Sequence, residues 1–478
     1  MKKILILLFI GVVAVAIGTT NAQKILVPPY LQPGNAPSLS KELKVVIWQT
    51  DSVPGNFKVD FGAGTSLAQT TKLQTAKVTS FQLKLLGKTT FLYRATLTGL
   101  QFDTEYTYRV SQGAEVVATN TFATRTKKAS TRFVAFGDCG AGTPQQAEIA
   151  FRVFQRKPEF VLVVGDNVYS SGLEREYRTR FFPAYTAANA SVKTGAPLMQ
   201  SIPFYMLVGN HDVQAWKLDK TPDGLAFFYY NDLPLNAPVT EFTIKPVGEA
   251  ALMKAFEKAA GDRFPRIANY SFDNGNVHIV CIDANAYTNT LDPVLVEWLR
   301  RDLGSSKADW KIVSFHQPGF NGAKSHYDYQ SMRLLSPLFE EFKVDLVISG
   351  HVHNYQRSQP LKFAPKRDST GENYVISRDG RVDGTFTLDQ KFDGVTNTKA
   401  MGIIYIVTGA GGAVLYDEGI SNKPEMWKHD PPANWVPFTV KLISDIHSYT
   451  LIETEGKKLT LRQFDLKDNE IDGIVMTK

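Results

Sequence analysis

The chain has 478 residues, and its 43% hydrophobic and 12% aromatic content is that of an ordinary globular protein. This length exceeds what one hydrophobic core usually holds, so we expect two domains. The formal net charge of +6 is mild and no run rich in lysine and arginine accompanies it, which argues against nucleic acid as a partner.

The first residues have the pattern of a secretory signal. Lys2 and Lys3 form a positive start, residues 4–18 are apolar, and Thr-Asn-Ala at 20–22 suits a cleavage site. A retained membrane anchor is the alternative, but the apolar run is short for a span of roughly 20 residues. We therefore expect residues 1–22 to be a signal peptide. The mature protein would be periplasmic or extracellular, free of the membrane, with a charge of +4 once the two lysines are removed.

Cysteine usage is sparse, with only Cys139 and Cys281 present. An exported protein could pair them, but a single pair is not a disulfide framework. Because Cys281 lies in the apolar run 277–282, two buried free thiols are favoured over a bridge.

Residues 23–127 have β-strand patterns and no convincing helix. The runs, separated by turn residues, are 43–50, 56–61, 76–86, 90–97, 105–111 and 115–122. Several short strands with regular turns predict an all-β sandwich. We expect Trp48 to fill the space between its sheets and Tyr106 to be a corner tyrosine that hydrogen-bonds back to the chain. The polar stretch 124–131 marks the domain boundary.

From residue 128 to 478, apolar β-runs alternate with segments of helical spacing. Helices are predicted at 145–155, 249–260, 294–303 and 331–342, and strands at 344–348, 401–407 and 449–464, the last with a hairpin turn at 455–457. This alternation predicts an α/β layered domain. Residues 212–267 are the least readable part, because proline-rich loops surround the one predicted helix.

Potential metal ligands occur in five short motifs, each at the end of an apolar β-like run. The motifs are Gly137-Asp138-Cys139-Gly140, Gly165-Asp166-Asn167-Val168-Tyr169, Gly209-Asn210-His211-Asp212, Val313-Ser314-Phe315-His316 and Gly350-His351-Val352-His353. Ligands at the ends of several buried strands converge in space even when they are far apart in sequence. Imidazole suits zinc, iron or manganese better than magnesium or calcium. The pattern predicts a two-metal hydrolase.

Each motif alone has an ordinary interpretation. Asp138 after a glycine could be a common turn, Tyr169 a core aromatic, and His316 a satisfied core histidine. Their joint occurrence at strand ends favours the metal site, since three of the chain's eight histidines belong to the proposed ligand set.

In this order, the motifs resemble those of the calcineurin-like metallophosphoesterases, and specifically of the purple acid phosphatases. The resemblance covers nearly the whole mature chain. Residues 28–32, 93–95 and 104–106 resemble that family's fibronectin-type-III-like domain, and residues 270–278 resemble a strand segment of its catalytic domain. The resemblance implies a fibronectin-III/Ig-like β-sandwich followed by a four-layer α/β metallophosphoesterase sandwich.

The resemblance also implies a role for each ligand. Asp138, Tyr169 and His353 would hold the first metal, and Asn210, His316 and His351 the second, with Asp166 bridging the two. The phenolate of Tyr169 sets the purple group apart and prefers ferric iron. The implied cofactor is therefore Fe(III) paired with a divalent Fe, Zn or Mn ion.

The implied activity is hydrolysis of small phosphate monoesters by attack of a metal-activated hydroxide, that is, an acid phosphatase. His211 would hydrogen-bond the phosphate oxygens. His326, in the loop 321–326, resembles the family's substrate-loop histidine and would protonate the leaving alkoxide, although a simple exposed histidine is the alternative. His278 alternates inside a strand and is interpreted as structural.

Some positions depart from the family's pattern or leave alternatives open. Cys139 occupies a variable place, and Asp212 stands where the family often has Glu. The segment between Asp212 and Tyr270 fits the family poorly, so the residues that line the substrate pocket are not assigned. The turn 408–412 lacks the lysine and helix of a nucleotide loop, which favours a tight turn under the metals.

Two other functions remain as alternatives. A phosphodiesterase could use the same metal centre. A surface-binding protein on a decayed hydrolase scaffold is the other, against which the intact ligand set argues. Neither the substrate nor the oligomeric state follows from the sequence.

Overall fold

The computed structural model describes residues 23–68, 70, 72–85, 88–428 and 438–478. The expected signal peptide, residues 1–22, lies outside the described residues. No helix in the described part of the chain has the length and apolar character needed to cross a membrane.

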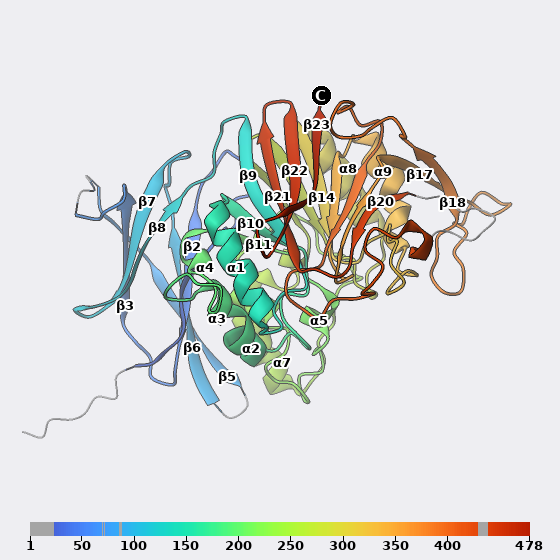
Figure 1. Cartoon of the computed structure of the whole chain (residues 1–478). Coiled ribbons are helices and arrows are strands. Elements are labelled where there is room, and N and C mark those ends of the chain that lie inside the picture. The colour runs from blue at the N-terminus through green and yellow to red at the C-terminus, as the bar shows by residue number, and fades with distance from the viewer. Residues whose placement is uncertain (1–22, 69, 71, 86–87, 429–437) are drawn as a thin grey trace, which may run out of the picture.

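The N-terminal part is all β-structure, as predicted, and lies at the left of Figure 1. Two antiparallel four-stranded sheets have the orders β1-β2-β6-β5 and β4-β3-β7-β8. The strands are β1 Ile25–Gln32, β2 Lys44–Thr50, β3 Phe57–Ala63, β4 Gln74–Ala76, β5 Val78–Leu85, β6 Lys88–Leu97, β7 Glu105–Gln112 and β8 Glu115–Ala123. The sequence missed β1 because its two prolines hide the strand pattern.

The core of this domain confirms two single-residue predictions. Trp48 is fully buried, stacks on Tyr93 with ring centroids 5.3 Å apart and meets the ring of Phe57 edge-on at 5.2 Å. The hydroxyl oxygen of Tyr106 accepts a hydrogen bond of 3.0 Å from the backbone N–H of Gln101. Tyr106 is therefore a corner tyrosine.

The remainder of the chain forms an α/β domain around two larger sheets (Figure 1). The six-stranded sheet contains β11 Phe204–Met206, β10 Phe160–Val163, β9 Ser130–Phe136, β21 Ser448–Glu455, β22 Lys458–Asp465 and β23 Glu470–Thr477. The seven-stranded sheet contains β12 Tyr270–Asn274, β13 Val277–Ile282, β14 Trp310–Phe315, β15 Leu346–Ser349, β19 Ile404–Thr408, β16 Tyr355–Ser358 and β20 Thr439–Ile443. A small separate pair joins β17 Leu361–Pro365 to β18 Gly384–Leu388.

The helices are mostly short, with three longer exceptions. The longer ones are α1 Pro144–Arg156, α7 Ala250–Ala260 and α8 Pro293–Ser305. The others are α2 Glu174–Glu176, α3 Phe182–Tyr185, α4 Leu198–Ser201, α5 Asn210–Val213, α6 Phe227–Tyr230 and α9 Ser336–Glu341, with the π-helical η1 Tyr177–Phe181 and the 3₁₀ helices η2 Gly261–Arg263, η3 Arg266–Ala268, η4 Ser331–Leu335 and η5 Pro424–Met426.

The two large sheets pack face to face, with helices outside them. In β14, Ile312 belongs to the cluster that includes β9, β10 and α1, whereas Val313 belongs to the cluster with α8 and α9. Alternate residues of one strand thus face the other sheet and the outer helices. This arrangement confirms the α/β layering that the sequence predicts.

Three helix predictions hold within one or two residues, and one is wrong in part. The segment predicted as a single helix over 331–342 divides into η4 and α9. Pro337 stands in the first turn of α9, where its missing N–H is harmless, but it cannot continue a helix that began a turn earlier.

Candidate metal centre

The predicted ligands lie where strands of the two large sheets end. Asp138 follows β9, Asp166 follows β10, and Asn210 begins α5 after β11. These three strands are parallel neighbours in the six-stranded sheet. His316 follows β14, and the segment from His351 follows β15, its parallel neighbour in the other sheet. The centre therefore lies where the carboxyl ends of strands from both sheets meet.

One group of ligand atoms surrounds the hydroxyl of Tyr169. This oxygen lies 3.0 Å from Asp138 Oδ1, 3.3 Å from Asp166 Oδ2 and 2.9 Å from His353 Nε2. His353 Nε2 is in turn 3.4 Å from Asp138 Oδ1. These are the residues that the resemblance assigns to the first metal, together with its bridge.

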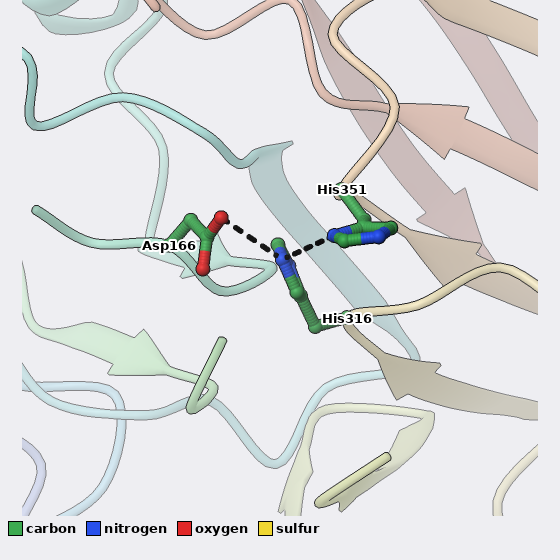
Figure 2. Close-up of side chains that lie close together, drawn as sticks. All are labelled: Asp166, His316 and His351. Atoms are coloured by element: carbon green, nitrogen blue, oxygen red, sulfur yellow. Dashed lines mark hydrogen bonds and ion pairs between the residues drawn. The ribbon is translucent and has the colours of Figure 1, made fainter. Parts of the chain in front are cut away.

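A second group surrounds His316. Its Nε2 atom lies 3.2 Å from Asp166 Oδ2, 3.2 Å from Asn210 Oδ1 and 3.3 Å from His351 Nδ1. Figure 2 shows the His316 ring between Asp166 and His351, and one ligand atom from each of these three residues lies within 4.8 Å of the others. Asp166 Oδ2 thus faces both groups.

Hydrogen bonds to the opposite ring nitrogens hold the imidazoles in place. Nδ1 of His316 donates to the Val164 carbonyl oxygen at 2.8 Å, and Nδ1 of His353 donates to the Val414 carbonyl oxygen at 2.6 Å. A ring that donates from Nδ1 presents its Nε2 lone pair to the centre, which is how metal-binding histidines are usually oriented. Nε2 of His351 is buried and has no hydrogen-bond partner among the described residues.

The donor set fits metal cations. Carboxylate, amide, phenol and imidazole atoms converge in a buried space, where the Tyr169 hydroxyl and His316 Nε2 can each donate only one proton but each has three polar neighbours. Acceptors that lack donors are costly to bury, whereas cations satisfy several at once. Imidazole and phenol in the set favour transition metals over magnesium or calcium.

Charges in the cluster shift the titration of its members. Burial alone would raise the pKa of Asp166, but the imidazoles of His316, His211 and His351 hold it well below its usual value. Burial, followed by the charges of Asp138 and Asp166, raises the pKa of Tyr169 well above its usual value.

The two histidines of the second group shift in opposite directions. Burial opposes the charged form of His316, but Asp166 and Asp138 outweigh it and raise the pKa to about 9. Burial, His316 and His326 lower the pKa of His351 far below its usual value. The shifts differ because His316 lies beside carboxylates, whereas His351 lies beside other histidines.

Asp212 lies directly behind the centre and fixes the backbone that carries Asn210. Its Oδ2 accepts hydrogen bonds from the backbone N–H of Gly209 at 2.9 Å and the Asn167 side chain at 2.8 Å, and its Oδ1 accepts from the Tyr177 hydroxyl at 2.9 Å. Burial and the charge of Asp166 raise the pKa of this carboxyl to about 7. The sequence flagged Asp212 as a departure without identifying this support.

Tight packing beneath the ligands explains the glycine-rich turn after β19. A Cβ on Gly409 would lie 2.7 Å from Asp138 Oδ2 and 2.3 Å from the carbonyl oxygen of Val352. The backbone N–H of Ala413 donates to the carbonyl oxygen of Asp138 at 2.8 Å. The turn 408–412 thus lies under the site, as favoured from the sequence. Cys139 and Cys281 are buried and free, also as favoured.

The two histidines with predicted substrate roles lie beside different members of the centre. His211 Nδ1 donates to the Ser170 carbonyl oxygen at 2.6 Å, and its Nε2 is 3.8 Å from Asp166 Oδ2. The His326 ring centroid lies 4.1 Å from that of His351. Burial and the nearby His353 lower the pKa of His326.

Two aromatic residues that the sequence did not single out also border the centre. Tyr416 stacks on His353, and Tyr329 contacts both His326 and His351. No sequence signal would have found them, because each lies in a loop whose path depends on the complete fold.

Two known protein families match the chain, one in each of its two parts. Residues 131–355 match the calcineurin-like phosphoesterase family, and residues 34–126 match the purple acid phosphatase N-terminal domain. The chain therefore contains a calcineurin-like phosphoesterase domain that follows a purple acid phosphatase N-terminal domain.

Individual similar proteins have more specific names. The chain is 26% identical to purple acid phosphatase 23 of Arabidopsis thaliana over 62% of its own length and 65% of that protein, and 25% identical to a phosphoenolpyruvate phosphatase of Allium cepa over 70% and 63%. The match thus spans just under two thirds of these relatives. The solved structure of purple acid phosphatase PPD1 from yellow lupin shares the fold, with a TM-score of 0.60 and 15% identity over 94% of this chain and 74% of that one. The chain thus combines a calcineurin-like phosphoesterase domain with a purple acid phosphatase N-terminal domain and is similar to proteins named purple acid phosphatases.

Proposed function

We propose that the protein is an acid phosphatase that hydrolyses small phosphate monoesters at a centre of two metal ions. The observation that carries the proposal is the position of Asp166 Oδ2, 3.3 Å from the Tyr169 hydroxyl and 3.2 Å from His316 Nε2. One carboxylate oxygen that faces two separate ligand groups is the arrangement expected of a bridge between two cations.

The ligand assignment follows from these groups. Asp138, Tyr169 and His353 would hold one ion, and Asn210, His316 and His351 the other. When bound, two such ions would polarise the phosphoryl oxygens and lower the pKa of a water molecule to roughly 7.

The phenol of Tyr169 favours a trivalent ion in the first position. A phenolate is a charged oxygen ligand, and a strongly polarising cation such as Fe(III) displaces its proton better than a divalent ion does. The second group, with imidazole and amide ligands, suits divalent Fe, Zn or Mn.

The protein's own residues would position the ester and move one proton. His211, tied to Ser170 through Nδ1, presents Nε2 toward the centre, where a protonated ring donates to a phosphate oxygen. His326 lies beside His351, where it would give a proton to the oxygen of the departing alcohol.

The direct test is hydrolysis of para-nitrophenyl phosphate against bis(para-nitrophenyl) phosphate by protein of measured metal content. A preference for the monoester supports the proposal. A clear preference for the bis-ester would replace it with the phosphodiesterase alternative, and hydrolysis of neither by fully loaded protein would favour a binding role.

We also propose that the protein is exported and that residues 23–127 and 128–478 form its two domains. The lysine pair and apolar run at the N-terminus support export. Sequencing the N-terminus of protein recovered from the periplasm or medium tests this, with Gln23 expected as the first residue.

A further inference from the structure

The side of the centre that carries His326 is built from aromatic rings. Tyr416 lies flat against His353, with ring centroids 3.8 Å apart and an angle of 9° between the planes. Its backbone N–H donates to the His353 carbonyl oxygen at 3.1 Å, and His353 Nδ1 donates to Val414, two residues before Tyr416. Tyr416 is thus held to a proposed metal ligand through both its ring and its backbone.

Tyr329 borders the same space from another loop. Its ring centroid is 5.5 Å from that of His326, in a stacked arrangement, and 5.3 Å from that of His351, edge-on. The backbone N–H of Tyr329 donates to the His326 carbonyl oxygen at 3.2 Å and closes a turn between them. Tyr329 is 51% exposed, so its ring is available to a ligand.

The two tyrosines flank His326 and their loops are joined. The His326 ring lies 5.6 Å from that of Tyr416 and at almost the same distance from that of Tyr329. The backbone N–H of Ser325 donates to Asp417 Oδ2 at 2.9 Å, which links the His326 loop to the Tyr416 loop. The three rings therefore form one prearranged wall instead of three independent side chains.

This wall determines what a departing alcohol would touch. If His326 protonates the leaving oxygen, the carbon atoms attached to that oxygen lie beside His326. The surfaces nearest to them are the rings of Tyr329 and Tyr416. A planar aromatic group in that place can stack on either ring, an arrangement that a saturated group of similar size makes less well.

We propose that Tyr329 and Tyr416 are specificity-determining residues that select phosphate monoesters in which an aromatic ring lies next to the ester oxygen. The inference rests on the proposed phosphatase function and on the place of His326 in it. It assigns the substrate class of the site, for which the chain offers a stacking surface on the leaving-group side.

The test compares benzyl phosphate with cyclohexylmethyl phosphate. Both release a primary alcohol of similar size and acidity, so the ratio of their kcat/KM values isolates the aromatic ring. We expect the wild-type protein to favour the benzyl ester by about threefold to tenfold, the range that an aromatic pair contributes. Tyr329→Leu and Tyr416→Leu should each move the ratio toward one, and Tyr416→Phe should preserve it.

Phe242→Leu is the matched control. Phe242 is 38% exposed and lines a different pocket with Trp216 and Ile244. Its replacement should leave the ratio unchanged. Because Tyr329 is exposed and outside the proposed ligand set, Tyr329→Leu carries the test even if Tyr416→Leu disturbs His353.

The outcomes separate this inference from the function on which it rests. Hydrolysis of both esters at a wild-type ratio near one, or a ratio that survives both leucine variants, overturns the inference alone. A ratio that falls in Phe242→Leu but not in the tyrosine variants also overturns it, because the organic group would then lie in the other pocket. Hydrolysis of neither ester by fully loaded protein overturns the proposed function and this inference with it.

Discussion

Two clusters of ionisable side chains in the α/β domain, each around a buried histidine, differ in how their polar atoms are satisfied. In the first, His278 donates from Nδ1 to Asp273 Oδ1 at 2.7 Å and from Nε2 to Asp302 Oδ2 at 3.0 Å. Each carboxylate there meets a donor. In the second, around Asp166 and His316, the Tyr169 hydroxyl and His316 Nε2 each have one proton for three polar neighbours.

The difference shows that burial of charged groups does not by itself mark a functional site. The His278 cluster is complete without any further species, because a protonated imidazole satisfies both carboxylates. The Asp166 cluster becomes satisfied only when cations or protons enter it. A buried cluster with unmatched acceptors is therefore the better indicator of function, and the predictions below test that distinction.

The largest effect is expected for Asp166→Asn. An amide cannot bridge two cations as a carboxylate does, so both metals should bind weakly and kcat/KM should fall by more than about 10³-fold, beyond the loss of a single oxyanion donor. The protein should nevertheless stay folded, because asparagine has nearly the same size and shape as aspartate. Metal analysis, kinetics and the thermal midpoint of the purified variant measure its metal binding, kcat/KM and folding.

Asp302→Asn makes the same chemical change in the His278 cluster and is its control. It should lower the thermal midpoint and leave metal content and kcat unaltered. Loss of metal in Asp302→Asn, or full activity in Asp166→Asn, would contradict the distinction between a structural and a metal-binding cluster.

His326→Ala is expected to have the next largest effect. Loss of a general acid should lower kcat by about 10²- to 10⁴-fold for esters of poor leaving groups, and much less for para-nitrophenyl phosphate, whose leaving group hardly needs a proton. A series of monoesters graded by leaving-group acidity measures this. Equal losses across the series would count against the acid role.

His278→Gln should destabilise the protein in a pH-dependent way. Burial opposes the charged form of His278, but hydrogen bonds to Asp273 and Asp302 outweigh it and raise the pKa from 6.5 to about 9. Because the folded pKa lies above the unfolded one, the stabilisation of about 3 kcal/mol is complete below pH 6.5 and is lost as pH rises through 9. Thermal midpoints of both proteins at pH 6, 7.5 and 9 should converge with rising pH; a constant gap would contradict the charged-imidazole account.

Tyr106→Phe should have the smallest effect. It removes one neutral hydrogen bond, from the Gln101 N–H, in the β-sandwich and should cost about 1 kcal/mol of stability. Denaturant unfolding measures the loss, and the phosphatase activity is the control, since Tyr106 lies outside the α/β domain. A change in kcat would mean that the two domains are coupled in function.

The convergence of the proposed ligand residues could be predicted because their placement depends on local pattern and one rule of sheet geometry. Each motif follows an apolar strand, and the carboxyl ends of parallel strands meet at one edge. Asp138 and Asp166 therefore converge as soon as β9 and β10 pair. The separation into two groups around Asp166 required the resemblance, because spacing alone does not say which ligand joins which metal.

The parts that the sequence did not reveal depend on contacts between distant loops. Tyr416 lies beside His326 in a structure where two loops about 90 residues apart are joined by the Ser325–Asp417 hydrogen bond. The break between η4 and α9 was missed because helical spacing continues across Pro337 even though the backbone hydrogen bonds cannot.

The most direct test of the two-metal centre is metal content and visible absorption, measured on the wild type, Tyr169→Phe and His278→Gln. The account predicts two transition-metal ions per chain, one of them iron, and a visible charge-transfer band that Tyr169→Phe loses and His278→Gln keeps. A purified wild-type chain that binds no transition metal, or a band that survives in Tyr169→Phe, would contradict it.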